Sequence, residues 1–339
     1  MPANLTPEYK AAEGAFRQAR DPRERLQWLR EMLRTVPKHK GTNRLQADIK
    51  TRIKQLTEEL AGPRKGAAHG GPAISIPPEG AAQVALIGPP NSGKSALHVK
   101  LTGSNAQVGP YPFTTQYPQP GMLPFEDVFF QLVDLPPIAP EHPIPWIGNA
   151  LERADASLLV PDLTSPSCVN QVSDLLEYLG RKRVHLTSSW PSNTGGIRSP
   201  QLDDPFALLL PTLMLVNKAD MVAGMADEVA VFRELSGVEY PELPVSAETG
   251  EGLDAIGPWL FRKLEIIRVY TKAPGRPADQ GRPFTVRHGG TVDDVARLVH
   301  KDFSQSLKFA KLWRKGHTGV QQVGRHHPVE DGDLLELHT

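Results

Sequence analysis

The sequence has 339 residues, of which 39% are hydrophobic and 22% are charged, so it suits a globular protein of two or three domains. The longest apolar stretch, residues 206–216, contains Pro211 and is too short for a bilayer, and the polar N-terminus lacks the pattern of a secretory signal. One cysteine, Cys168, excludes an internal disulfide. We therefore expect a cytoplasmic protein with a passive thiol and no membrane partner.

The net charge is zero, but the charges are unevenly distributed. Residues 1–66 have 15 Lys/Arg against 8 Asp/Glu, residues 67–281 have 14 against 23, and residues 282–339 have 9 against 7. A basic first segment beside an acidic middle indicates a polyanionic partner at one end of the protein. A solvated helical surface explains the same charges equally well, and no DNA specificity is expected.

Residues 1–66 are predicted to form a basic helical arm. Apolar residues recur there at helical spacing, Asp21-Pro22 is typical of a helix start, and residues 37–42 interrupt the pattern. Two antiparallel helices are therefore expected. Residues 67–82 lie in a stretch rich in Gly, Pro and Ala and are predicted to be a linker.

Between residues 83 and 272, short apolar runs alternate with amphipathic segments, which is typical of a doubly wound, mainly parallel α/β sheet. The predicted strands are residues 84–87, 128–133, 157–160, 213–216 and 243–245. The predicted helices are residues 93–101, 168–180, 225–236 and 253–270. Residues 187–206 are predicted to form a surface loop.

A second linker, residues 273–281, contains Pro274, Gly275 and Pro277 and precedes a compact unit of residues 282–339. Within this unit the pattern predicts strands at 284–286 and 334–337. It also predicts a helix over 292–300, which Thr291 opens with acidic residues in the first turn, where negative charge suits the helix dipole.

The residues after the first predicted strand match the phosphate-binding pattern G-x-x-x-x-G-K-[ST]. The motif consists of Gly88, Pro89, Pro90, Asn91, Ser92, Gly93, Lys94 and Ser95. Because it follows a strand and opens a helix, its backbone N–H groups are expected to face phosphate oxygens. Lys94 would neutralise the β- and γ-phosphates, and the Ser95 hydroxyl would coordinate Mg²⁺.

Three further polar motifs follow predicted strands. Asp134 ends a strongly apolar strand and can hold Mg²⁺ through water. In the segment Asn217, Lys218, Ala219, Asp220, the carboxylate of Asp220 can accept hydrogen bonds from N1–H and the N2 amino group of guanine, a pair of donors that adenine lacks. A backbone N–H in the segment Ser246, Ala247, Glu248 can serve the guanine O6. Together these motifs predict a site for GTP or GDP.

With these motifs the chain resembles the Obg/DRG family of translation-associated GTPases, especially its DRG-like branch with a C-terminal TGS domain. The resemblance rests on GPPNSGKS (88–95), YPFTT (111–115), DLPP (134–137), NKAD (217–220) and SAE (246–248). It also rests on PFTVRHGGTVDDVARLVHKDF (283–303) and VGRHHPVEDGDLLELH (323–338), which look like a β-grasp TGS domain. The resemblance implies that Phe113, Thr114 and Thr115 belong to switch I, with Thr115 as a second Mg²⁺ ligand.

The sequence departs from this family in the segment Asp134, Leu135, Pro136, Pro137, where the last residue replaces a glycine. The backbone N–H of that glycine binds the γ-phosphate in the family, and proline has none. The next residue, Ile138, occupies the place of a water-orienting glutamine in Ras-like enzymes, and an apolar residue there is usual in the resembled family. A proline-rich segment, residues 136–145, replaces the family's glycine-rich one. Hydrolysis is therefore expected to be slow or absent. The resemblance also places Asn91 where related GTPases bind K⁺, which would partly compensate.

Two other groups of residues contain side chains that could bind a metal or RNA. His317, His326 and His327 lack the ligand spacing of a zinc site. The aromatic residues Phe309 and Trp313 alternate with basic ones, which suits either single-stranded RNA or a half-buried strand or helix, and the second interpretation is favoured.

The sequence thus predicts a basic helical arm, a P-loop G domain and a β-grasp domain. The predicted function is a slow Mg²⁺-dependent GTPase that acts as a switch on the ribosome or on structured RNA, with a protein partner possible at the TGS-like domain. The alternative is a GTP-binding scaffold with little or no hydrolysis. An ATPase is not favoured, because Asp220 selects guanine.

Overall fold

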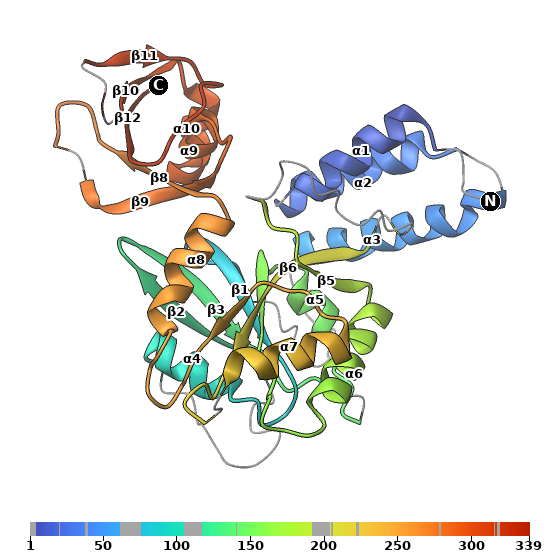
Figure 1. The fold of residues 1–339 in the computed structure, drawn as a ribbon. Coiled ribbons are helices and arrows are strands. Elements are labelled where there is room, and N and C mark those ends of the chain that lie inside the picture. Colours follow the sequence, from blue (N-terminus) through green and yellow to red (C-terminus); the bar gives the residue numbers. More distant parts are fainter. Residues whose placement is uncertain are drawn as a thin grey trace. The chain divides into compact units, whose positions relative to one another are not determined.

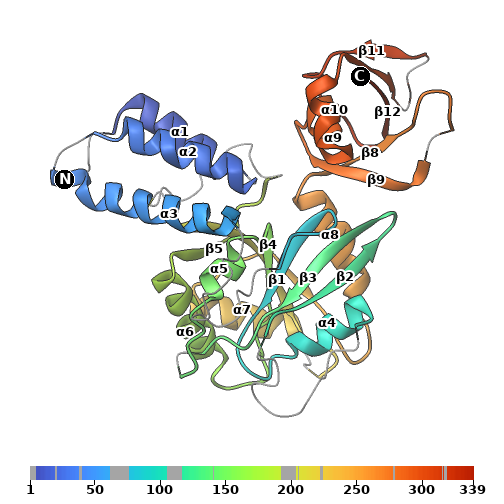
Figure 2. The same ribbon diagram turned by 180° about the vertical axis from the view of Figure 1, so that it is seen from behind.

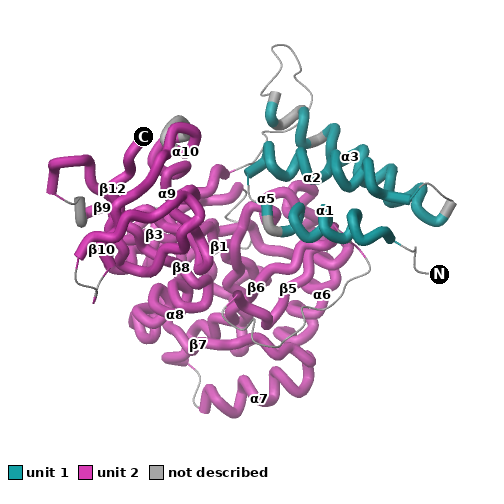
Figure 3. The backbone as a smooth tube through the Cα atoms, turned by 90° about the horizontal axis from the view of Figure 1, so that it is seen from above, with its two compact units in different colours: residues 1–73 teal, residues 74–339 magenta. Residues whose placement is uncertain are grey.

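The computed structural model forms two compact units, Met1–Ala73 and Ile74–Thr339 (Figure 3). The unit boundary falls within the predicted linker 67–82. No helix in the described part of the chain is long and apolar enough to cross a membrane. The structure describes residues 5–19, 21–37, 40–61, 76–104, 117–139, 141–191, 204, 206–221, 224–277, 279–314, 316 and 319–339.

The described residues of the first unit form three α-helices, not the two that the sequence predicted. The third helix arises because the first predicted helix is divided at Asp21-Pro22. Pro22 cannot donate a backbone hydrogen bond, and Asp21 is extended and accepts a hydrogen bond from the backbone N–H of Arg23 at 2.7 Å, which caps the second helix. The elements are α1 (Pro7–Gln18), α2 (Pro22–Thr35), η1 (Lys40–Thr42) and α3 (Asn43–Ala61).

The helices of the first unit pack through apolar side chains spaced three or four residues apart. Leu26, Leu29 and Met32 line the buried face of α2, which is the pattern of an amphipathic helix. Tyr9 of α1 and Ile49 of α3 are fully buried as well. The opposite faces retain the exposed basic side chains.

A seven-stranded sheet with strand order β2-β3-β1-β4-β6-β5 forms the centre of the second unit, and β7 also pairs with β6 (Figure 1). Only β2 is antiparallel to its neighbour, so the predicted mainly parallel sheet is confirmed. The strands are β1 (Ala82–Ile87), β2 (Gln119–Phe125), β3 (Val128–Asp134), β4 (Ala156–Leu159), β5 (Val184–Thr187), β6 (Leu208–Val216) and β7 (Glu242–Pro244).

Two of these strands, β2 and β5, were not predicted. Pro120 and Pro124 obscure the strand pattern of β2, and both prolines are tolerated because β2 is an edge strand. The strand β5 has only four residues and is paired with β6 alone. Short edge strands carry too few residues for a periodic signal.

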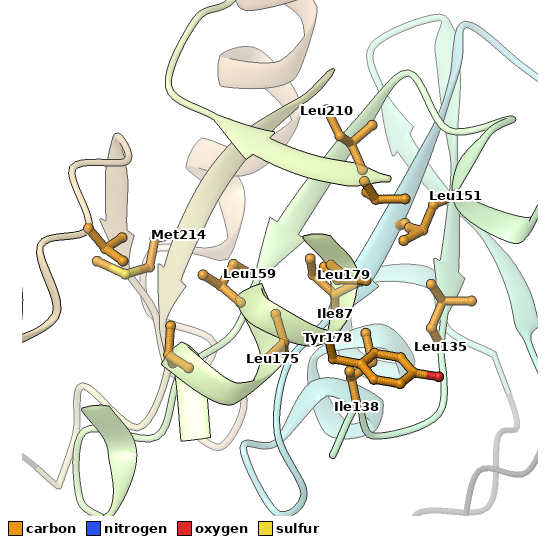
Figure 4. Close-up of a cluster of buried hydrophobic side chains, with 14 of the residues drawn as sticks. Ile87, Leu135, Ile138, Leu151, Leu159, Leu175, Tyr178, Leu179, Leu210 and Met214 are labelled. Carbon is orange, nitrogen blue, oxygen red and sulfur yellow. The ribbon is translucent and has the colours of Figure 1, made fainter. Parts of the chain in front are cut away.

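Helices cover both faces of this sheet (Figure 2). Ala85 and Ile87 of β1 join one apolar cluster with α5, α6 and α7, part of which Figure 4 shows, whereas Val84 and Leu86 join another with α4 and α8. This alternation follows from the two-residue period of a strand. The helices are α4 (Lys94–Thr102), α5 (Ile147–Leu151), α6 (Cys168–Arg181), α7 (Met225–Ser236), η3 (Leu253–Ala255) and α8 (Ile256–Lys263).

Part of the predicted surface loop 187–206 is buried. Trp190 is 3% exposed and packs edge-on against Trp259 of α8, with ring centroids 4.5 Å apart. Phe206 is 5% exposed. The prediction of a surface loop was wrong at these two residues, because the surrounding Ser, Asn, Gly and Pro masked isolated aromatic anchors. Residues 192–203 lie outside the described part of the chain.

A second, five-stranded sheet has the order β11-β10-β12-β8-β9, and α9 packs against it through Val292, Val295 and Ala296. A capping box between Thr291 and Asp294 starts α9, as the acidic first turn predicted. The elements are β8 (Ile266–Thr271), β9 (Asp279–Arg287), α9 (Val292–Val299), α10 (Lys301–Ser306), β10 (Phe309–Trp313), β11 (Gln321–Val323) and β12 (Asp333–His338).

The predicted helix 253–270 was wrong in its second half. The helix α8 ends at Lys263, Glu265 takes a left-handed conformation with φ +51°, and residues 266–271 form β8. Isoleucine, valine, tyrosine and threonine favour a strand there. Since β8 pairs with β9 and β12, the C-terminal domain starts before the predicted linker 273–281.

The strand β10 settles the interpretation of the alternating aromatic and basic residues. Lys311 pairs with Glu336 at 3.2 Å, and Arg314 pairs with Asp333 at 2.7 Å. The Trp313 ring lies 4.1 Å from the ammonium of Lys272. These ion pairs satisfy Lys311 and Arg314 within the domain, and alternate residues of β10 are buried, so the half-buried strand is the better interpretation. Among the described residues, no group of three His, Cys, Asp or Glu could hold a metal.

Candidate guanine-nucleotide site

The predicted site residues meet at one edge of the central sheet. The phosphate-binding loop follows β1, Asp134 ends β3, and Asn217 follows β6. Leu86 pairs with Asp134 in register, and Leu159 of β4 pairs with Met214 of β6, so the carboxyl ends of these parallel strands lie together. Ligands of open α/β sheets bind at this edge.

The phosphate-binding loop has the backbone that its sequence requires. Asn91 has φ +61° and Gly93 has φ +88°, and Gly93 precedes the first residue of α4 without a side-chain cap. The Ser92 hydroxyl donates to the carbonyl oxygen of Pro89 at 3.0 Å. The N-terminus of α4 therefore presents backbone N–H groups that suit a phosphate.

Lys94 is the buried cation of this loop. Its side chain is 4% exposed, and its ammonium donates to the carbonyl oxygen of Pro89 at 3.0 Å. Burial lowers the pKa of Lys94 to about 8, and the nearby Asp134 carboxylate opposes this shift. A dianionic phosphate group beside the ammonium would restore the charged form.

This pKa predicts that nucleotide binding takes up a proton in mildly alkaline solution. The pKa of free Lys94 is about 8. At a lower pH, Lys94 is charged with or without the nucleotide, whereas at a higher pH the ammonium forms only when the phosphate binds. Affinity for GDP should therefore fall as the pH rises above about 8. Titration calorimetry in buffers of different ionisation enthalpy should find larger proton uptake at about pH 8.5 than at about pH 7; equal uptake at both would contradict this.

Ser95 and Asp134 supply oxygen ligands on one side of the loop. The Ser95 hydroxyl donates to the Asp134 carboxylate at 2.6 Å, and Asp134 is 1% exposed. A hydroxyl next to a carboxylate is a donor set that Mg²⁺ accepts, because this cation prefers oxygen ligands. The residues present thus fit Mg²⁺.

Asn217 connects the phosphate-binding loop to the loop after β7. Its amide Nδ2 donates to the carbonyl oxygen of Ser92 at 3.1 Å, and its Oδ1 accepts the backbone N–H of Ala247 at 3.1 Å. The side chain is 3% exposed. One buried amide therefore holds the phosphate-binding and the predicted base-binding segments at a fixed separation.

The predicted guanine-recognition residues lie in contact with each other. The Ser246 hydroxyl donates to Oδ1 of Asp220 at 2.5 Å and accepts the backbone N–H of Thr249 at 3.0 Å. This orients the Asp220 carboxylate and leaves it hydrogen-bond capacity for a ligand. Glu248, the last residue of the SAE motif, is exposed.

The segment that follows Asp134 is packed into the protein interior. Leu135 and Ile138 are each 1% exposed, and Pro136 and Pro137 are also buried. The N–H of Ile138 donates to the carbonyl oxygen of Gly88 at 3.2 Å. Ile138 lies in the same apolar cluster as Leu135 and Tyr178 (Figure 4). It therefore places no polar side chain beside the phosphate-binding loop.

A hydrogen-bonded tyrosine fixes the end of this segment. The Tyr178 hydroxyl of α6 accepts the N–H of Ile144 at 2.7 Å and donates to the carbonyl oxygen of the same residue at 3.0 Å.

The predicted switch I residues Phe113, Thr114 and Thr115 lie outside the described residues.

The chain matches two known families. Residues 83–188 match the 50S ribosome-binding GTPase family, and residues 267–339 match the TGS domain. GTP-binding proteins of Methanocaldococcus jannaschii and Halobacterium salinarum are 28% and 26% identical; each comparison covers 93% of this chain, and 92% and 98% of the relative. Developmentally-regulated G-protein 1 of Arabidopsis thaliana is 25% identical over 93% of this chain and 90% of its own. The chain is a DRG-like GTP-binding protein.

The resemblance of the sequence to the Obg/DRG family with a C-terminal TGS domain is thereby confirmed. The fold of this DRG-like protein is also that of the YchF GTPase of Schizosaccharomyces pombe, with a TM-score of 0.51 at 14% identity. That match covers 78% of this chain and 99% of the YchF chain. It concerns the fold alone.

Sequence reasoning missed one charged residue at the site of the DRG-like protein. Asp162 lies shortly after β4 and forms an ion pair with Lys218, with 2.6 Å between Oδ2 and Nζ. The signal for it was present, since Asp162 follows a buried apolar strand in the same way that Asp134 ends one. Its partner could not be identified without the order of the strands.

Cys168 was expected to be a passive thiol, and its surroundings agree. The side chain is 4% exposed at the start of α6, and burial raises the pKa of its thiol to about 11. A thiol with so high a pKa contains almost no nucleophilic thiolate near neutral pH.

Proposed function

We propose that this DRG-like protein is a slow, Mg²⁺-dependent GTPase that acts as a switch on the ribosome. The observation that carries the proposal is the convergence of the Lys94 loop, Asn217 and Asp220 at one sheet edge, with the buried Ile138 in the place of a polar water-orienting residue. The first three suit a guanine nucleotide, and the fourth suits slow turnover.

In the proposed reaction, a water oxygen bonds to the γ-phosphorus, the bond to the β–γ bridging oxygen breaks, and GDP and phosphate are released. Lys94 would bind the β- and γ-phosphates, and the N–H groups at the start of α4 would orient them. Ser95 and Asp134, with Thr115 by family resemblance, would hold Mg²⁺. The cation would supply charge neutralisation at the phosphates.

Two features support slow hydrolysis. Pro137 has no N–H for the γ-phosphate, and the N–H of Ile138 is already donated to Gly88. Neither residue can orient the attacking water through a side-chain hydrogen bond. Asn91 would partly compensate by holding K⁺ beside the phosphates, where a cation stabilises developing charge.

A ribosomal partner is supported by the family match and by the charge of the arm. The name of the matched family describes ribosome-binding GTPases. Exposed basic side chains on α2 and α3 present several positive charges to solvent, which suits an RNA surface. They are Arg23, Arg30, Arg44, Lys50 and Lys54. This role would place the protein in the cytoplasm.

Co-sedimentation with purified ribosomes tests the proposal. The protein is mixed with ribosomes in GDP or in a non-hydrolysable GTP analogue at physiological salt, and the fraction in the pellet is measured. Binding should be stronger with the analogue and should weaken as salt rises, since Lys and Arg displace counterions from RNA. Absence of binding in both nucleotide states would refute a ribosomal partner.

The buried segment around Pro137 also favours a second function, a GTP-binding scaffold. In this alternative the G domain binds GTP without turning it over, and the nucleotide stabilises the fold. Multiple-turnover phosphate release, measured in K⁺ and in Na⁺, separates the two functions. Sustained release supports the GTPase, and release no faster than buffer supports the scaffold. Equal rates in the two salts would show that K⁺ held by Asn91 does not contribute to hydrolysis.

A further inference from the structure

Lys218 lies beside the predicted guanine site in a conformation that requires support. It follows β6 between Asn217 and Ala219 and has φ +65°, which is unfavourable for a residue with a Cβ atom. Its side chain is 27% exposed, yet its ammonium lies 2.6 Å from Oδ2 of Asp162. The long flexible chain of a lysine is thus held in one direction.

The carboxylate that holds Lys218 is itself fixed. Asp162 is 7% exposed, and its other oxygen, Oδ1, accepts the Thr164 hydroxyl at 2.6 Å and the Thr164 backbone N–H at 3.1 Å. Its own carbonyl oxygen accepts the N–H of Ser165 at 3.1 Å. One carboxylate oxygen therefore anchors Asp162 to its own loop and leaves the other for Lys218.

The order of the strands places this pair at the nucleotide site. Asp162 follows β4, and β4 lies between β1, which leads into the phosphate-binding loop, and β6, which leads into Asn217 and Lys218. The N–H of Val160 donates to the carbonyl oxygen of Ile87 at 2.9 Å, so the Asp162 loop begins next to Gly88. Asp220, the predicted guanine-binding carboxylate, follows Lys218 by two residues.

We propose that Asp162 is a positioning residue for guanine-nucleotide binding, which acts by holding the side chain of Lys218 against the base-binding site. A lysine restrained before the ligand arrives loses little side-chain freedom when the ligand binds. The carboxylate also neutralises the ammonium, which leaves the methylene groups as an apolar wall for a planar base. The proposal rests on guanine-nucleotide binding and is independent of hydrolysis and of a ribosomal partner.

The test is the dissociation rate of a fluorescent GDP analogue from the full chain. Asp162→Asn preserves the shape of the side chain and removes its charge, and we expect dissociation to become about tenfold faster. GTP should be affected by the same factor, because the base is common to both nucleotides. Asp204→Asn is the matched control: it removes a surface carboxylate that pairs with Arg183 at 3.2 Å, and it should leave the rate unchanged.

A double-mutant cycle separates positioning from a general structural role. If Asp162 acts through Lys218, the effect of Asp162→Asn should disappear in a Lys218→Met background, whereas a structural role would leave it intact. Asp162→Glu retains the charge, so its nucleotide should dissociate more slowly than that of Asp162→Asn. An unchanged rate in Asp162→Asn, or the same factor in both backgrounds, overturns the proposal. If Asp162→Asn fails to fold, Thr164→Val replaces it: this variant loosens the carboxylate, so faster dissociation supports the proposal and an unchanged rate overturns it.

Discussion

Gly93→Ala is expected to abolish measurable GDP binding, with an affinity loss of more than about 100-fold. The reason is a close approach that only glycine allows. A Cβ atom at this position would collide with the amide nitrogen of Asn217, and φ at Gly93 is +88°. Moving Asn217 would break its hydrogen bonds to Ser92 and Ala247. The substitution should therefore separate the phosphate-binding loop from the base-binding loop.

Gly103 provides the matched control at the other end of the same helix. It has φ +66°, it caps the C-terminus of α4, and a Cβ atom added there would meet no atom within 4 Å. Gly103→Ala should cost about 1 kcal/mol of unfolding free energy through backbone strain alone and leave GDP affinity unchanged. Titration calorimetry and thermal unfolding measure both effects. Normal GDP binding by Gly93→Ala would refute the role assigned to Asn217.

Asp220→Asn is expected to lower GDP affinity by about 10²- to 10³-fold and to make xanthosine diphosphate the preferred ligand. The Asp220 carboxylate, oriented by the Ser246 hydroxyl, suits the N1–H and N2 donors of guanine. Asparagine replaces one acceptor oxygen with a donor group. Xanthine has a carbonyl oxygen in place of the N2 amino group, so the hydrogen bond that guanine loses is available to xanthine.

The control for this substitution is Asp227→Asn, which removes the charge of an exposed carboxylate in the first turn of α7. It should change neither affinity nor selectivity. Competition of guanine, xanthine and adenine nucleotides against fluorescent GDP measures the preference directly. Retention of guanine preference by Asp220→Asn would show that base recognition lies elsewhere in the chain.

Much of the G domain was predictable from the sequence, because its signals are local. Each of the five predicted strands of the central sheet is present, and helices α4, α6 and α7 occur within a residue of the prediction. Gly93 and Lys94 of the phosphate-binding loop are likewise recognisable in the sequence. Few other residue types can adopt the backbone conformation of the first or neutralise the phosphate charge as the second does. The errors lie where the local signal is weak. The proline-containing edge strand β2 was missed, and the strand-forming residues after Lys263 were joined to a helix.

The sequence alone therefore determined that this chain contains a guanine-nucleotide motif set between strands and helices, followed by a C-terminal TGS domain. Only the tertiary structure decided that Asn217 joins Ser92 to Ala247, that Asp162 holds Lys218, and that Ile138 is buried beneath the phosphate-binding loop. The physical reason is that these contacts join residues from different strand ends. Their proximity depends on strand order and register, which long-range packing sets and local residue preferences do not.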